Sequence, residues 1–162
     1  MKLITRFAMV VAVSAVVLAL GGAEAQARVS QLKGKILITQ KIPSKGTSLA
    51  KFFTKNATGT LKTKAGETKW HFQFFAVLRK APPSDVVNIV FYEYRGGRYK
   101  YVNAEDLKIS NPGSGTIQVT GKYKVYGVLG FKKGKSYQMR LAVKDARGNE
   151  VVYARSRRLT LK

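Results

Sequence analysis

Segments of strand length in which apolar and polar residues alternate recur along this chain, and Gly- and Pro-rich turns separate them. The most apolar segment covers 69–80, KWHFQFFAVLRK, where Phe72, Phe74, Ala76 and Leu78 share one face. Because successive side chains of a strand point to opposite faces, this segment predicts a central strand. Its start holds Trp70, the only tryptophan, which we expect to be buried in the core.

The other alternating segments predict further strands. They cover 33–39, 86–95, 98–102, 116–126, 137–143 and 151–162, and the Thr-, Lys- and Gly-rich segment 57–67 is expected to be a loop or a short edge strand around 60–64. Gly96-Gly97 predicts a tight hairpin, and 103–115, which includes Asn111-Pro112-Gly113, a connecting loop. Since no strand–helix–strand rhythm is present, we expect an all-β fold, a single antiparallel β-sandwich of about seven or eight strands.

One short helix is expected among these strands, over 48–55. Thr47 or Ser48 can cap its N-terminus, and Leu49, Phe52 and Phe53 fall on one face. We expect the two phenylalanines to close one end of the sandwich, and insertion of this face into lipid is the alternative.

Residues 1–27 have the features of a bacterial secretory signal peptide. Two basic residues precede an apolar run over 7–20, and small residues allow cleavage after Ala25 or Ala27. The run has 14 residues, whereas a membrane-spanning helix needs roughly 20, so we expect cleavage and no retained anchor. Without cysteine there is no lipobox, which excludes a lipoprotein. We therefore expect a periplasmic or extracellular protein.

Positive charge dominates the mature chain. Removing Lys2, Arg6 and Glu24 with the leader leaves 28 basic and 7 acidic side chains. Residues 28–162 suit one domain with its own core, in which 28–66 supplies a strand, the short helix and a loop leading into the sandwich. Because an exported chain without cysteine has no disulfides, apolar burial must stabilise it.

The segment 131–158 carries two spaced motifs. Phe131 lies six residues before Tyr137, Gly134 lies three before it, and Asp145 and Gly148 belong to an expected hairpin turn. This spacing resembles the tyrosine corner of fibronectin type III and bacterial immunoglobulin-like domains. The resemblance implies an immunoglobulin-like β-sandwich in which the Tyr137 hydroxyl bonds to upstream backbone and fixes a crossover between sheets.

The chain offers little catalytic chemistry. His71 is the only histidine and cysteine is absent, which excludes multi-histidine metal sites, thiol catalysis and thiolate zinc. We therefore expect a protein without catalytic residues, metal or cofactor. Because the carboxylates fall almost entirely in expected loops, where two of them could face each other, a carboxylate-based hydrolase is the alternative. The carboxylates are Glu67, Asp85, Glu93, Glu105, Asp106, Asp145 and Glu150.

Basic residues and tyrosines interleave in the expected hairpin over 92–101 and again over 122–126. Cations attract polyanions at long range, and tyrosine rings can stack on sugars or bases. The candidate polyanion-binding residues are Arg95, Arg98, Lys100, Lys122, Lys124, Tyr99 and Tyr101. We expect a binding module for lipopolysaccharide, acidic polysaccharide or nucleic acid. A structural or protein-adaptor domain with an envelope protein partner is the alternative.

Overall fold

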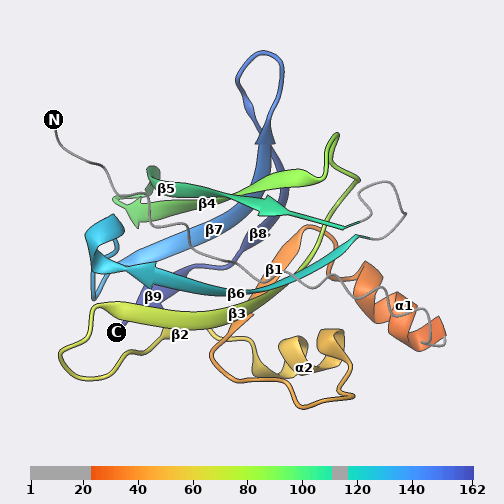
Figure 1. The fold of residues 1–162 in the computed structure, drawn as a ribbon, viewed down its shortest axis with the longest axis horizontal. Coiled ribbons are helices and arrows are strands. Elements are labelled where there is room, and N and C mark those ends of the chain that lie inside the picture. Colours follow the sequence, from red (N-terminus) through yellow and green to blue (C-terminus); the bar gives the residue numbers. More distant parts are fainter. Residues whose placement is uncertain (1–22, 111–116) are drawn as a thin grey trace, which may run out of the picture.

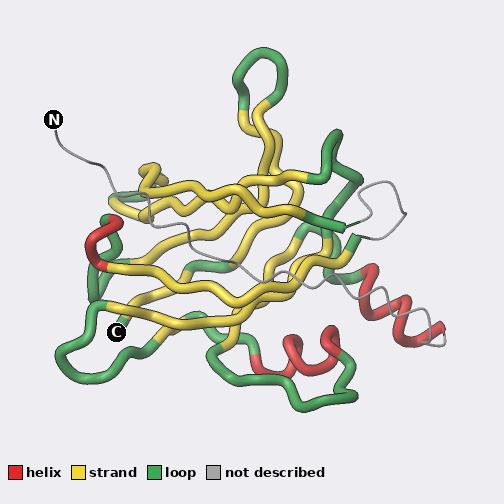
Figure 2. The backbone as a smooth tube through the Cα atoms, in the orientation of Figure 1, coloured by secondary structure: helices red, strands yellow, loops and turns green. Residues whose placement is uncertain are grey.

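The computed structural model describes residues 23–110 and 117–162, which are mostly β (Figure 1 and Figure 2). The helices are α1 (Ala23–Ser30), α2 (Leu49–Asn56) and the 3-10 turn η1 (Gly127–Leu129). The strands are β1 (Lys35–Thr39), β2 (Thr60–Leu61), β3 (Lys69–Val77), β4 (Val86–Arg95), β5 (Arg98–Lys108), β6 (Gln118–Tyr126), β7 (Ser136–Lys144), β8 (Glu150–Ser156) and β9 (Leu159–Leu161). The expected predominance of strands is confirmed.

Two sequence-based expectations fall partly beyond these ranges. Residues 1–22 of the predicted leader lie outside the described residues, and 23–27 form the start of α1. Asn111-Pro112-Gly113 of the predicted loop also lies outside them. Among the residues that the structure describes, no helix is long and apolar enough to cross a membrane.

The strands form one mixed sheet, so the expectation of a wholly antiparallel arrangement is wrong. Along the sheet the order is β2, β9, β7, β8, β1, β3 and β6, and β4 pairs with both β7 and β5. β1 runs parallel to β8, and β2 runs parallel to β9. An alternating sequence indicates which residues share a face of a strand, but it does not indicate which strands lie beside it. The local sequence therefore could not predict these two parallel pairs.

The sheet curls, so that β4 and β6 face each other across the main core. The Phe91 ring of β4 lies 5.3 Å from the Tyr123 ring of β6, and Phe72 of β3 lies 5.6 Å from Tyr123. Phe72, Phe74, Ala76 and Leu78 all belong to this core, as their alternation predicts. Trp70 is also buried there, and its Nε1 donates to the Lys162 carbonyl oxygen at 3.1 Å.

Two strand boundaries differ from the prediction. β5 continues to Lys108, where a loop was expected from residue 103, because pairing with β4 and burial of Leu107 outweigh the low strand propensity of residues 103–106. The single strand expected over 151–162 is two, β8 and β9. The Ser156 hydroxyl accepts from the Met139 N–H at 3.0 Å and donates to the Arg157 carbonyl at 2.6 Å, at the break between them.

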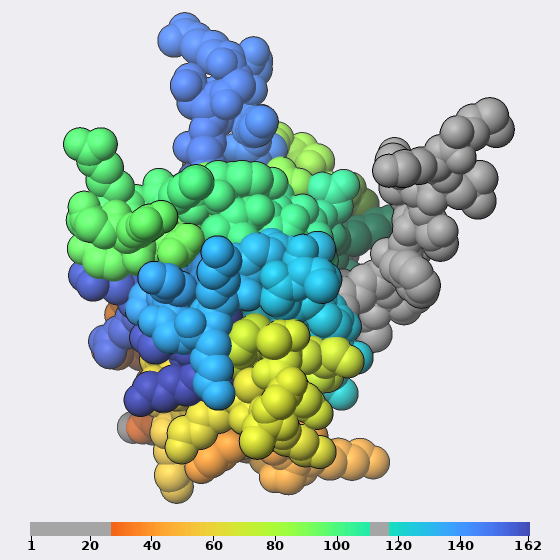
Figure 3. Space-filling view, turned by 90° about the vertical axis from the view of Figure 1, so that its left-hand side faces the viewer, coloured from red at the N-terminus to blue at the C-terminus, as the bar shows by residue number. Residues whose placement is uncertain are grey.

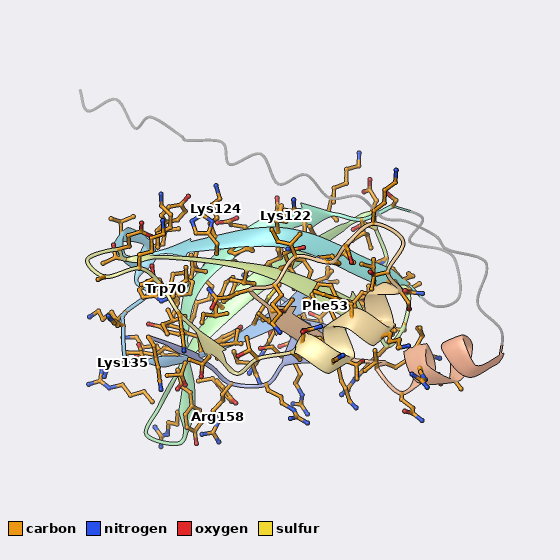
Figure 4. The ribbon with its side chains drawn as sticks, turned by 90° about the horizontal axis from the view of Figure 1, so that it is seen from below. Phe53, Trp70, Lys122, Lys124, Lys135 and Arg158 are labelled. Atoms are coloured by element: carbon orange, nitrogen blue, oxygen red, sulfur yellow. The ribbon has the colours of Figure 1, made fainter. Side chains whose placement is uncertain are left out.

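A second, smaller core lies on the outer face of β1 and β3, under α2. Phe53 is 2% exposed and stacks on Phe75 of β3 with ring centroids 5.7 Å apart, and Val77 and Leu32 join them (Figure 4). The helix therefore falls where 48–55 predicted it, but it covers a sheet face. The expectation that its phenylalanines close one end of the fold is wrong, because Phe75 and Val77 make the outer face of β3 apolar as well.

The segment 131–158 adopts the local geometry that its spacing predicts. The Lys132 N–H donates to the Tyr137 hydroxyl at 2.7 Å, and the Phe131 ring packs 5.1 Å from the Tyr137 ring. Gly134 has φ of 79°, a conformation that glycine adopts without strain. In the hairpin between β7 and β8, Asp145 Oδ1 accepts from the N–H groups of residues 147 and 149, and Gly148 has φ of 80°.

Candidate functional site

The hairpin of β4 and β5 separates the tyrosines from the cations predicted to act with them. Tyr94 pairs directly with Tyr99, and Tyr92 with Tyr101, so these four rings share the outer face. Arg95 pairs with Arg98, and Glu93 with Lys100, on the opposite face of the same hairpin. Tyr99 and Tyr101 are exposed on one side, and Arg95, Arg98 and Lys100 on the other.

Lys122 and Lys124 lie on a different strand, β6, which pairs with β3 and not with the hairpin. Both are exposed on the outer face, because Tyr123 between them points into the core. The seven predicted residues are therefore divided among three surfaces. Within the described residues, no strand pairing joins β6 to the hairpin.

Lys122 and Lys124 instead belong to an uncovered part of the outer face of β3 and β6. Lys122 pairs with Gln73, Lys124 pairs with His71, and Lys69 pairs with Tyr126. The Lys69 ammonium lies 5.4 Å from the centre of the Tyr126 ring. This face is open because α2 covers only its other half, at Phe75 and Val77.

The lysines of this face contribute to a lowered pKa of His71. Partial burial lowers the pKa of His71 from its ordinary value, and the charges of Lys124 and Lys69 lower it further, while Glu67 opposes them. The two ammonium groups therefore disfavour protonation of the imidazole. His71 is thus a neutral, exposed member of a cationic surface near pH 7.

A cluster of lysines lies at the adjoining end of the molecule. Three separate segments bring them together: the loop after β2, the turn over 131–135, and the end of β9. The lysines are Lys62, Lys64, Lys132, Lys133, Lys135 and Lys162, and all are exposed. Figure 3 looks onto this end and shows the segments near 60–70 and 120–135 side by side.

Backbone hydrogen bonds join those three segments. The Thr63 N–H donates to the Lys162 carbonyl at 3.1 Å, and the Lys162 N–H donates to the Leu61 carbonyl at 2.8 Å. The Gly134 N–H donates to the Leu161 carbonyl at 2.6 Å. The lysine cluster is therefore attached to a hydrogen-bonded frame and not to independent loops.

The lysine cluster and the open face are continuous through Lys69. This residue begins β3 where the 62–68 loop ends, and its carbonyl accepts from the Thr63 hydroxyl at 2.6 Å. We call the joint region the basic surface. It comprises Lys62, Lys64, Lys69, His71, Lys122, Lys124, Lys132, Lys133, Lys135 and Lys162. Glu67, on the same loop, is its nearest acidic neighbour in sequence and accepts from Thr63 at 3.4 Å.

The carboxylates considered for hydrolysis are distributed around the molecule. Asp85 lies 3.6 Å from Lys108, Asp106 accepts from Asn88, and Asp145 holds a turn. Glu150 pairs with Arg140 at 3.0 Å. Across the described residues, no group of three or more histidines, aspartates and glutamates could hold a metal ion.

Glu105 points inward from β5 toward β6. It pairs with Ile89 of the core and lies near the buried hydroxyl of Tyr123, which makes no hydrogen bond within the described part of the chain. Burial raises the pKa of Tyr123 far above its ordinary value, and the adjacent Glu105 carboxylate adds to that shift.

No protein-family model matches this chain, and no curated protein matches it in sequence.

Proposed function

We propose that this chain is an exported, non-catalytic binding module for an anionic polymer of the cell envelope or the extracellular space. The ligand classes are lipopolysaccharide, acidic polysaccharide and DNA. The basic surface carries this proposal, because nine lysines from four segments lie on a continuous, exposed region. Such a region attracts a polyanion at long range and releases its condensed counterions on contact.

The basic surface also suits a long ligand better than a small one. Its lysines are exposed and spread over an end and a face, and no salt bridge joins any of them to a carboxylate within the described residues. Arg95, Arg98 and Lys100 belong to the hairpin of β4 and β5 and are not counted in the basic surface. At physiological salt, a cation more than about 8 Å from the ligand adds only a weak attraction, because dissolved ions screen it.

Export forms part of the proposal. The basic start, the apolar run over 7–20 and the small residues at Ala25 and Ala27 support a signal peptide. N-terminal sequencing of the protein recovered from a bacterial periplasmic fraction should begin at residue 26 or 28. Recovery of a chain that still begins at Met1 would contradict processing.

We further infer that the scaffold is related to immunoglobulin-like sandwiches. The neighbouring strands β5, β4, β7 and β8, and the neighbouring strands β1, β3 and β6, support this, since immunoglobulin-like domains also divide seven strands into a group of four and a group of three. The hydrogen bond from Lys132 to Tyr137 supports it as well. An experimental structure with β5 paired to β6 would overturn the inference, because a closed barrel is a different architecture.

Charge reversal tests the proposed function. One variant carries Lys→Glu at five positions of the basic surface, namely Lys122, Lys124, Lys132, Lys133 and Lys135. A control carries the same reversal at five exposed cations elsewhere, namely Lys45, Lys51, Lys55, Lys144 and Arg147. Retention on heparin and binding to lipopolysaccharide are then measured against salt concentration.

We expect wild-type binding to weaken steeply with salt and the surface variant to lose both affinity and salt slope, by roughly one unit of slope per lost contact. The control should keep most of both. Equal losses in the two variants would mean that bulk charge alone drives binding. Unchanged binding of an envelope protein partner by both variants, with no polyanion binding, would support the adaptor alternative instead.

A further inference from the structure

The outer face of β4, β5 and β7 carries a second set of interacting side chains, on another side of the molecule from Lys122 and Lys124 (Figure 4). Its four tyrosines come from the two cross-strand pairs described above, with ring centroids 6.2 Å apart for Tyr92 and Tyr101 and 5.2 Å apart for Tyr94 and Tyr99. Tyr101 is 58% exposed and Tyr99 39% exposed. Two large rings therefore face solvent beside two that support them.

Arg140 of β7 is fixed against these rings. Its guanidinium lies 4.2 Å from the centre of the Tyr92 ring and 5.2 Å from that of Tyr99. Gln138 accepts from its Nε at 2.9 Å, and Glu150 accepts from its Nη1 at 3.0 Å. The Tyr92 hydroxyl also donates to Glu150. Because each partner is held by another, little side-chain entropy remains to be lost when a ligand binds.

Arg158 differs from Arg140 in having an unpaired charge. Its guanidinium stacks 3.9 Å from the centre of the Tyr94 ring, and no carboxylate pairs with it within residues 23–110 and 117–162. Stacking on an aromatic face leaves the edge donors of a guanidinium free, and those donors suit carboxylate or sulfate groups. The same face thus offers exposed rings next to a free cation.

We propose that Tyr92, Tyr94, Tyr99, Tyr101, Arg140 and Arg158 form a platform for an acidic polysaccharide. The exposed rings of Tyr99 and Tyr101 stack on sugar rings, and Arg158 pairs with a carboxylate or sulfate of the chain. The inference rests on the proposed function and specifies its ligand class. Figure 4 places Lys135, of the lysine cluster, at the end of the molecule, with Arg158 and Lys124 on different sides. One long chain crossing that end would reach both the platform and the basic surface.

The test compares two polyanions of matched charge, a heparin-derived oligosaccharide, which has sugar rings, and linear polyphosphate, which has none. The variants are Tyr99→Ala/Tyr101→Ala, the corresponding double Phe variant, and Tyr101→Ala alone, which changes the most exposed ring. Ile42→Ala, which shortens an exposed apolar side chain outside both the platform and the basic surface, is the control. Unfolding curves establish that each variant is folded.

Loss of the two rings should weaken oligosaccharide binding by about tenfold or more, the scale on which a single ring stacked on a nucleobase contributes to binding. Polyphosphate binding and its salt slope should stay unchanged, and the double Phe variant should bind like the wild type. The proposal fails if both polyanions lose affinity alike, if neither does, or if a single-stranded oligonucleotide is the ring-dependent ligand. Absence of salt-dependent polyphosphate binding by the wild type would count against the proposed function instead.

Discussion

Tyr137 joins the turn before β7 to the core through one hydrogen bond and one ring contact. Its hydroxyl accepts from Lys132, its ring packs against Phe131, and the side chain is 1% exposed. Both partners lie within six residues of it. Because the interacting residues are so close in sequence, their spacing can be recognised from the sequence alone. The contacts of this corner could therefore be predicted residue by residue.

Replacing the Tyr137 hydroxyl should weaken the fold without creating a cavity. We expect Tyr137→Phe to lower the free energy of unfolding by about 1 kcal/mol, the net contribution of an ordinary hydrogen bond. Tyr101→Phe is the control, because its exposed hydroxyl can bond to water in both states. Urea denaturation measures both variants, and equal stability of Tyr137→Phe and wild type would contradict the role of this bond.

Tyr92 should make stability depend on alkaline pH. Burial raises the pKa of Tyr92 from 10.0 to about 12, and its hydrogen bond to Glu150 adds to the rise. A folded-state pKa above the unfolded value stabilises the protein below pH 10, and this stabilisation is lost as the pH rises from about 10 to about 12. Unfolding free energies measured across that window should fall less steeply for Tyr92→Phe than for wild type. Equally steep profiles would show that Tyr92 titrates normally in the folded protein.

The elements with strong alternation were predicted closely, and those stabilised by neighbours were not. β3 and β4 begin and end within a few residues of the expected bounds, and α2 falls where the Leu49, Phe52 and Phe53 spacing put it. The second half of β5 has little apolar pattern of its own, so its strand conformation comes from pairing with β4. The break between β8 and β9 depends on Ser156, whose partners are in β7 and at residue 157.

α2 should contribute to stability through Phe53. Removing a fully buried phenylalanine creates a cavity, so Phe53→Ala should lower the free energy of unfolding by about 3 kcal/mol or more. Lys51→Ala on the exposed side of α2 should change it little. Chemical denaturation and binding to anionic vesicles would both be measured. Unchanged stability together with lost vesicle binding would support a lipid-inserting helix and contradict a cover over Phe75.

At the scale of the whole molecule, the open edges at β5 and β6 carry features that oppose pairing with another chain. Glu105 points inward from β5, and Lys122 and Lys124 project from β6. Inward carboxylates and edge lysines are recognised means by which proteins avoid edge-to-edge association. These features therefore suit two sheet edges that do not pair with another chain.

The basic surface is a property of this topology and could be predicted only in part. Lys122 and Lys124 were identified from the sequence, yet they lie with Lys69 and Lys132 because β3 pairs with β6 and β9 bonds to two loops. Those contacts join segments up to about a hundred residues apart, so the local sequence pattern could not predict them. The available signal was the run Lys132-Lys133-Gly134-Lys135, since it concentrates three cations in the expected tyrosine corner.

Amide chemical-shift mapping with linear polyphosphate tests the basic surface most directly, because this ligand offers charge without rings. The largest perturbations should fall in 62–71, 122–124 and 132–135, and they should fade as salt is raised. Perturbations that are largest on α2 and the 144–150 hairpin, or that spread evenly over all exposed cations, would contradict a defined polyanion-binding surface.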